Sequence, residues 1–181
     1  MKQRGRVLLL TGPPGSGKST VAQLLVVRFE RAVHLVSDEF FHFIRTGYIE
    51  PWKPQSHEQN EVVMTAVADT ATAFALGGYF TVVDGILVPG WFHEPLETQL
   101  RAAGLDVSTV ILRPSLEACI TRVAQRSQDE RAVDPAAIEQ LWKGFADLGG
   151  LEPFAIDNND QAAETTADFV YGRLSLPPVV T

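Results

Sequence analysis

The stretch LLLTGPPGSGKSTVAQLL, residues 8–25, decides the expected fold. Its central part, residues 12–19, matches the pattern G-x-x-x-x-G-K-[ST] of a phosphate-binding loop, with an apolar run before it and an amphipathic helical pattern after it. Glycines let the backbone of such a loop wrap closely around phosphate groups, and the following helix directs its partial positive charge at them. The stretch therefore predicts a strand, a loop and a helix that together bind a nucleoside triphosphate.

Two side chains of this loop have expected roles in binding. Lys18 is expected to reach the β- and γ-phosphates, and Ser19 to offer its hydroxyl to Mg²⁺. We therefore expect ATP and Mg²⁺ as cofactors. The nucleotide-binding residues expected in this stretch are Gly12, Pro13, Pro14, Gly15, Ser16, Gly17, Lys18, Ser19 and Thr20.

Composition excludes several classes of protein. The 181 residues are 45% hydrophobic and 20% charged, as in an ordinary globular domain, and the net charge of −7 disfavours duplex nucleic acid as the main partner. No run approaches the roughly 18 apolar residues of a membrane span, and the apolar run near the N-terminus is too short for a signal peptide. We expect a cytoplasmic protein, monomeric or homodimeric, in which the single Cys119 is a packed thiol.

Strand and helix patterns alternate along the chain, which predicts an α/β fold with a parallel sheet covered by helices on both faces, in three layers. The five expected strands are residues 6–11, 32–37, 79–85, 107–114 and 153–157. The expected helices are residues 18–30, 57–76 and 92–103, one through Leu116, Ile120 and Val123, one over 135–148, and a closing helix over 163–174. We expect a single domain over residues 1–181.

Two acidic residues lie at predicted strand ends. Asp38 follows the second strand and Asp84 ends the third, so both are expected at the edge of the sheet that carries the phosphate loop. A carboxylate there can accept a proton from an attacking hydroxyl or hold a metal-bound water. We assign Asp38 as the general base and Asp84 to the metal, although the two roles can be exchanged. The structural alternatives are a helix cap for Asp38 and an Asp-Gly turn for Asp84.

The segment of residues 39–60 is long, aromatic and interrupted by proline, which is unusual for a plain crossover connection. Its aromatic residues are candidates to line a pocket for a partly apolar acceptor, although for any single one a core position is the commoner outcome. The expected acceptor-binding residues are Asp38, Phe41, Arg45, Trp52, Asn60 and Asp84. We interpret His34 as a structural residue within its strand and His93 as a solvated residue that opens a helix.

Five motifs together resemble the small P-loop kinases labelled as AAA-type ATP-binding domains. They are TGPPGSGKST, SDEFF, VVDGI, VILRPSLEACITRVAQR and LEPFAIDNND, within roughly residues 6–172. The group includes chloramphenicol phosphotransferase-like, gluconate kinase-like, shikimate kinase-like and zeta toxin-like enzymes. The resemblance implies a P-loop NTPase fold with strand order 2-3-1-4-5, and phosphoryl transfer from Mg-ATP to a hydroxyl, with Asp38 at the position that contacts the acceptor.

The resemblance also implies arginines around a small lid, here about residues 122–134. Arg126 would then stabilise the transferring phosphoryl group as a catalytic residue, while Arg122 would bind the nucleotide together with Asn158, in the loop expected beside the adenine. The structural alternatives are a solvated helix face for the arginines and an Asn/Asp-rich turn for residues 157–160.

The function indicated by these residues is that of an ATP-dependent small-molecule kinase, a phosphotransferase with an alcohol acceptor. No arginine occurs between Gly85 and Arg101, where nucleoside monophosphate kinases hold the phosphate of their acceptor, so a nucleotide acceptor loses support. Two alternatives remain open. One is an ATP-binding regulatory module or NTPase switch without a small-molecule acceptor, and the other is a toxin-like kinase acting on a nucleotide sugar.

Overall fold

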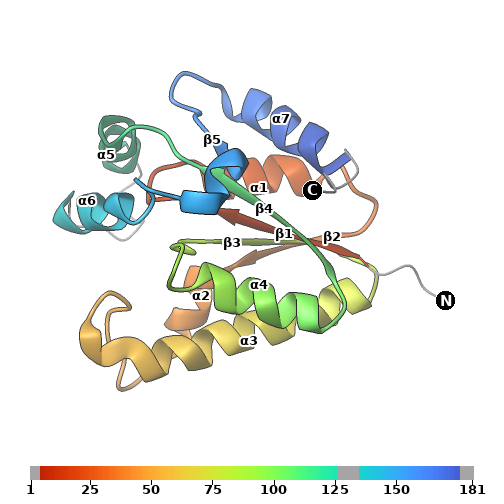
Figure 1. Cartoon of the computed structure of the whole chain (residues 1–181), viewed down its shortest axis with the longest axis horizontal. Helices are drawn as coiled ribbons and strands as arrows, with labels where there is room; N and C mark the ends of the chain where they lie inside the picture. Colours follow the sequence, from red (N-terminus) through yellow and green to blue (C-terminus); the bar gives the residue numbers. More distant parts are fainter. Residues whose placement is uncertain (1–4, 126–134, 176–181) are drawn as a thin grey trace.

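A computed structural model of the chain describes residues 5–125 and 135–175. Its centre is one five-stranded sheet in which every strand pair is parallel, with the order β2-β3-β1-β4-β5 (Figure 1). The predicted fold class and strand order are confirmed. No helix within the described ranges is both long and apolar enough to cross a membrane.

The strands and helices follow one another as the sequence patterns indicate. The strands are β1 (Arg6–Thr11), β2 (Ala32–Val36), β3 (Phe80–Gly85), β4 (Asp106–Leu112) and β5 (Ala155–Ile156). The α-helices are α1 (Lys18–Val26), α2 (Ser37–His42), α3 (His57–Leu76), α4 (His93–Ala102), α5 (Leu116–Ala124), α6 (Pro135–Lys143) and α7 (Ala163–Ser175). Two 3₁₀ turns, η1 (Pro54–Ser56) and η2 (Gly149–Phe154), precede α3 and β5.

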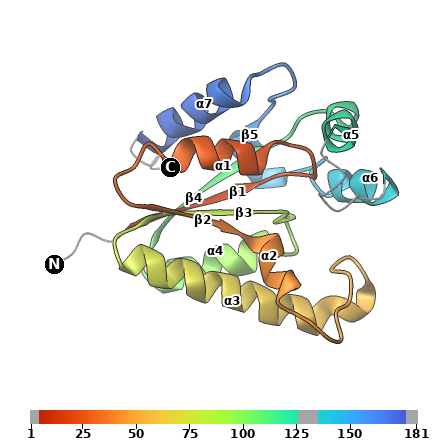
Figure 2. The same ribbon diagram turned by 180° about the vertical axis from the view of Figure 1, so that it is seen from behind.

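Helices cover both faces of the sheet. Helices α1 and α7 pack together on one face, and α3 and α4 cover the other, with α2 beside α3 (Figures 1 and 2). Helices α5 and α6 lie beyond the carboxyl ends of the strands, at the end of the sheet away from the start of β1 (Figure 1). Because ligands of parallel α/β sheets bind at the carboxyl ends of the strands, this end is where a functional site is expected.

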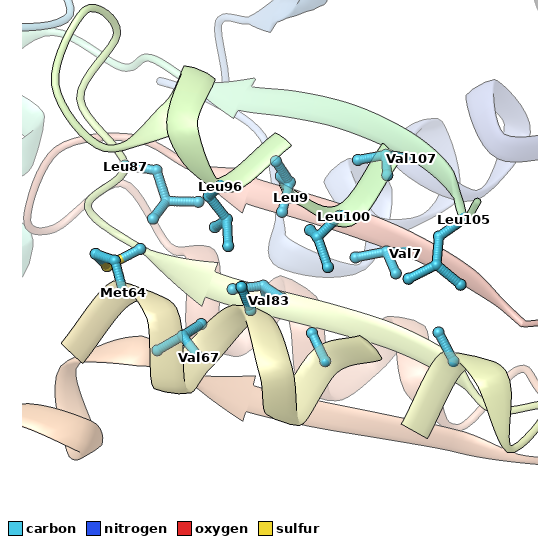
Figure 3. Packing of buried hydrophobic residues seen from close by; sticks show 13 residues of the cluster. Val7, Leu9, Met64, Val67, Val83, Leu87, Leu96, Leu100, Leu105 and Val107 are labelled. Carbon is cyan, nitrogen blue, oxygen red and sulfur yellow. The ribbon is translucent and has the colours of Figure 1, made fainter. Parts of the chain in front are cut away.

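The two faces of the sheet bury different residues of the same strands. Val7 and Leu9 of β1 pack with α3 and α4, as Figure 3 shows, whereas Leu8 and Leu10 pack against α1 and α7. Successive side chains of a strand point to opposite faces, so a strand covered on both sides is apolar at every position. This explains why residues 7–10 form an unbroken apolar run and are all fully buried.

Several predicted boundaries differ from the structure. Helix α1 ends at Val26, not at residue 30, and α6 ends at Lys143, although Phe145 and Leu148 beyond it are still buried. Strand β2 ends at Val36 because α2 begins immediately at Ser37, with no loop between them. Sequence patterns mark which residues are buried better than where the backbone changes conformation.

Two expectations about which side chains are buried were wrong. His93 is completely buried, not solvated, with its Nε2 2.9 Å from Thr109 Oγ1 of β4. In α5 the buried residue is Cys119, while Ile120, expected on the packing face, is exposed. Cys119 lies against the phosphate loop, where a Cβ atom on Gly15 would meet its backbone, whereas Leu116 and Val123 of the predicted stripe are half-buried.

His93 is expected to make folding stability depend on pH. Desolvation lowers the pKa of His93, against the attraction of Glu97, whose Oε2 lies 3.8 Å from Nδ1. The folded state thus favours the neutral imidazole, and stability falls as the pH drops below about 6.5, where the unfolded chain takes up a proton first.

In thermal unfolding between pH 5 and 7.5, the wild type should lose stability toward acid more steeply than His93→Gln, by at most about 1.4 kcal/mol per pH unit. Parallel pH profiles for the two proteins would contradict this assignment.

Candidate functional site

The phosphate loop connects β1 to α1 at the carboxyl edge of the sheet. Gly12, Gly15 and Gly17 all have positive φ angles, and the Ser16 amide donates to the Pro13 carbonyl across the turn. Lys18 Nζ donates to the carbonyl oxygens of Gly12 and Pro13, each at 3.0 Å. The ammonium group is therefore held against the loop itself.

The loop and the start of α1 fit an anionic ligand. Helix α1 has no side-chain cap at its N-terminus and no acidic residue in its first turn, and Ser19 and Thr20 are exposed there. Helix α5, by contrast, is capped by Ser115, whose Oγ accepts a hydrogen bond from the Ala118 amide. Uncapped amides at a helix N-terminus, with a lysine beside them, are the groups that bind phosphate.

Close packing against α5 fixes the outer side of the loop. A Cβ atom on Gly15, whose φ is 78°, would lie 2.4 Å from the Cys119 carbonyl oxygen. Only glycine fits this approach, both for space and for backbone conformation. The Cys119 thiol itself is buried, and this desolvation raises its pKa, which confirms the expectation of a packed thiol.

Asp38 is brought to the site by contact between α2 and the end of β3. Ser37, the first residue of α2, lies so close to Gly85 that a Cβ atom there would be 2.0 Å from the Ser37 hydroxyl oxygen. Gly85 is the neighbour of Asp84, and Ser37 is the neighbour of Asp38. The contact thus brings the two acidic residues to the same strand end.

The charges of Asp38, Asp84 and Lys18 act on one another. Asp38 is open to solvent, yet protein atoms surround much of its carboxyl group, and this desolvation raises its pKa. The Lys18 ammonium opposes that increase, while the Asp84 carboxylate adds to it. A carboxylate whose pKa is raised is a stronger base than an ordinary carboxylate, which suits Asp38 to accept a proton.

Asp84 is almost completely buried, and His34 of β2 binds it. His34 Nε2 lies 3.0 Å from Asp84 Oδ2, and because an ionised carboxylate only accepts, the imidazole is the donor. Together with the exposed Ser19 hydroxyl, Asp84 supplies oxygen ligands of the kind that Mg²⁺ takes. The described ranges contain no group of three acidic, histidine or cysteine residues that could hold a metal by themselves. Mg²⁺ at sites of this kind takes further ligands from water and from substrate phosphates.

The loop after β5 is tied to the phosphate loop. Asn158 is buried, and its Nδ2 donates to the Ser16 carbonyl at 2.9 Å. Arg122 Nη2 donates to the carbonyl oxygens of Asn158 and Asn159, each at 2.8 Å. Arg122 and Asn158 thus lie together, next to the phosphate loop. Arg126 and most of the expected lid lie outside the described residues.

The expected acceptor-binding residues differ from one another in burial and in position. Phe41 is buried one turn after Asp38, and Arg45 and Trp52 are exposed in the connection that follows. Asn60 is buried and holds this connection in place, since its Nδ2 donates to the Pro51 carbonyl and to Ser56 Oγ. Among the described residues, Arg45 has no hydrogen-bond or ion-pair partner.

Some of the aromatic residues line a separate groove of about 470 Å³ between α2 and α3. With about 3.6 residues per helical turn, Phe40 and Phe43 fall on the side of α2 opposite Asp38. The residues that line the groove include Phe40, Phe43, Ile44, Val62, Val63 and Ala66. The groove therefore does not open beside the acidic pair.

This combination of a five-stranded parallel sheet and a phosphate loop after its central strand defines a P-loop protein of the NTPase fold. A family model described as an AAA domain matches residues 7–148, and the chain belongs to this AAA domain family. No curated protein sequence is significantly similar to it.

Solved structures share the fold over nearly the whole chain. The tunicamycin resistance protein of Deinococcus radiodurans is 19% identical, with a TM-score of 0.68, over 96% of this chain and 98% of its own. The Mycobacterium tuberculosis APS kinase CysC, in complex with AMPPNP and APS, is 19% identical, with a TM-score of 0.66, over 96% and 99%. Shikimate kinase from Acinetobacter baumannii, in complex with shikimate, is 20% identical, with a TM-score of 0.61, over 95% and 94%. The expected resemblance to small P-loop kinases is confirmed.

Replacing Gly15 should weaken nucleotide binding. In Gly15→Ala the new methyl group meets the Cys119 carbonyl in a backbone conformation that alanine avoids, so the loop must move and its amides lose their common direction. We expect ATP affinity, measured by calorimetry, to fall at least about tenfold, the effect of about 1.4 kcal/mol.

Gly149→Ala is the matched control, because Gly149 also has a positive φ, of 50°, but a Cβ atom there meets nothing within 4 Å. Equal ATP affinity in Gly15→Ala and the wild type would show that the loop tolerates this contact.

Proposed function

We propose that the protein is an ATP-dependent kinase that transfers the γ-phosphoryl group of Mg-ATP to a hydroxyl of a small molecule. The observation that carries the proposal is the convergence of Lys18, Asp38 and Asp84, from three different segments, at the carboxyl edge of the sheet. A protein that only binds ATP needs the loop and its lysine. An acidic residue with a raised pKa, open to solvent beside that lysine, is suited to activating an acceptor.

In this reaction Asp38 acts as the general base. Its carboxylate takes the proton of the acceptor hydroxyl while the hydroxyl oxygen forms a bond to the γ-phosphorus. The bond between the γ-phosphorus and its bridging oxygen breaks, and ADP leaves with the electron pair. Lys18 balances the charge on the β- and γ-phosphates, and the loop amides hold these groups in place.

Asp84 acts on the metal side of the site. Bound Mg²⁺ would neutralise charge on the transferring phosphate groups, with Ser19 and Asp84 as the residues that hold it. Arg122 and Asn158 act at the nucleotide, since they join the loop after β5 to the phosphate loop. Arg126 is proposed as a further cation for the phosphoryl group. Phe41, Arg45, Trp52 and Asn60 are proposed to shape the acceptor side.

Kinase activity on small molecules in similar proteins supports this reading. APS kinase and shikimate kinase share the fold, and their structures are solved in complex with small molecules. At about 20% identity this likeness shows the fold alone, so the acceptor of this chain must be found by experiment.

The test is ADP release from Mg-ATP in the presence of a panel of hydroxylated metabolites and antibiotics. At least one acceptor should raise turnover above the rate without acceptor. If none does, while a partner protein raises ATP hydrolysis, the kinase assignment fails and the NTPase-switch alternative gains support.

With an active acceptor in hand, Asp38→Asn should lower the turnover number by about 10²- to 10⁴-fold with ATP affinity retained, because the amide cannot accept the proton. Glu39→Gln is the matched control: it neutralises the adjacent acidic residue, which pairs with His42 instead, and should keep most of the activity. Unchanged turnover in Asp38→Asn would remove Asp38 as the base.

A further inference from the structure

We propose that His34 is a positioning residue, which holds one oxygen of the Asp84 carboxylate so that the other oxygen stays directed at the nucleotide-bound metal. This inference rests on the proposed function, because it gives Asp84 its place on the metal side. It assigns a role to a histidine in the interior of an edge strand of the sheet, which the phosphate-loop chemistry does not otherwise use.

The register of the sheet puts His34 and Asp84 on one face. In the β2–β3 ladder His34 is opposite Val82, and Val36 is opposite Asp84. Val82 packs in the cluster that includes Val21 and Leu25 of α1. Since side chains alternate along a strand, His34, Val82 and Asp84 all point toward the side of the sheet covered by α1, the helix that begins at Lys18.

Among the described residues, His34 is the hydrogen-bond donor that can fix the orientation of the Asp84 carboxylate. The two side chains are 2% and 15% exposed, so water reaches the carboxylate poorly. In the part of the chain that the structure describes, the one hydrogen bond to this carboxylate is the 3.0 Å bond from His34 to Oδ2. A buried carboxylate without a donor is costly, and with a single donor its rotation is restricted.

The other carboxylate oxygen is where a ligand is needed. Across the sheet Asp84 is opposite Leu10, two residues before the phosphate loop begins at Gly12. If this second oxygen of Asp84 is held on the α1 side of the sheet, it lies on the same side as Lys18 and Ser19, the first residues of α1. Hydrogen-bond partners of metal-ligating groups fix their orientation, and loss of such a partner typically lowers metal affinity by about 10- to 100-fold.

The experiment compares ATP affinity in the presence of Mg²⁺ and in the presence of EDTA. In the wild type Mg²⁺ should tighten ATP binding. In His34→Leu, which removes the donor, this gain should shrink about tenfold or more, while affinity in EDTA stays unchanged. In His34→Gln, whose amide can donate, most of the gain should return.

His57→Leu is the matched control, because His57 also lies near a carboxylate, Glu61 at 3.5 Å, but on the exposed surface of α3. The proposal is overturned if His34→Leu keeps the full gain from Mg²⁺, if it loses affinity equally with and without Mg²⁺, or if His34→Gln behaves like His34→Leu.

A second measurement uses the unmutated site, in case His34→Leu does not fold. In ¹⁵N-labelled wild-type protein, imidazole NMR spectra should show that His34 carries its proton on Nε2, with a hydrogen-bonded shift that Asp84→Ala abolishes, because alanine has no acceptor. A proton on Nδ1, or a shift unaffected by Asp84→Ala, contradicts the proposal.

Neither measurement needs an acceptor. If no acceptor is ever phosphorylated but His34→Leu loses the gain from Mg²⁺, the proposed kinase function fails and the positioning role stands. If an acceptor is phosphorylated and the gain is unchanged, the reverse holds.

Discussion

Parallel pairing of β1 with both of its neighbours is the constraint on which the rest of the structure depends. The pairs β1–β3 and β1–β4 place Leu10 opposite Asp84 and Thr11 opposite Ile111, so three strands end at one edge. Parallel strands must be joined by crossovers, and the crossovers supply the helices that bury both faces. The phosphate loop, α2 and the connection to α5 all begin at this edge, because each of them follows the carboxyl end of a parallel strand.

Much of the fold could be predicted because its signals are local. An apolar run buried on both faces, a glycine-rich loop and a helical pattern ended by glycines each occupy one short window of sequence. Helix α3 is found with its predicted bounds, and the order of the strands follows from the kinase-like motifs. The residues proposed to meet a triphosphate can be named from the sequence for the same reason, since residues 12–20 are contiguous.

The rest of the site could not be predicted, because it depends on register and rotation. The pairing of His34 with Asp84 requires knowing that Val36 is opposite Asp84, and two strands read separately carry no such information. Likewise the segment of residues 39–60 is visibly aromatic, but only the start of α2 at Ser37 determines which rings share a side with Asp38. Phe41 does, whereas Phe40 and Phe43 turn toward the groove beside α3. The two sides of the helix cannot be distinguished from the sequence unless the first residue of the helix is known.

The hydrogen bond from Asn158 to the Ser16 carbonyl joins groups that are 142 residues apart in the chain. The phosphate loop is synthesised before β5, and this contact exists only after β5 and the turn beyond it have been made. Contacts this distant in sequence close large loops and form slowly compared with local ones. On the ribosome, the nascent chain should therefore carry the complete phosphate-loop sequence long before it carries a complete nucleotide site. Stabilisation by ATP would then begin only once β5 and the turn after it have joined the sheet.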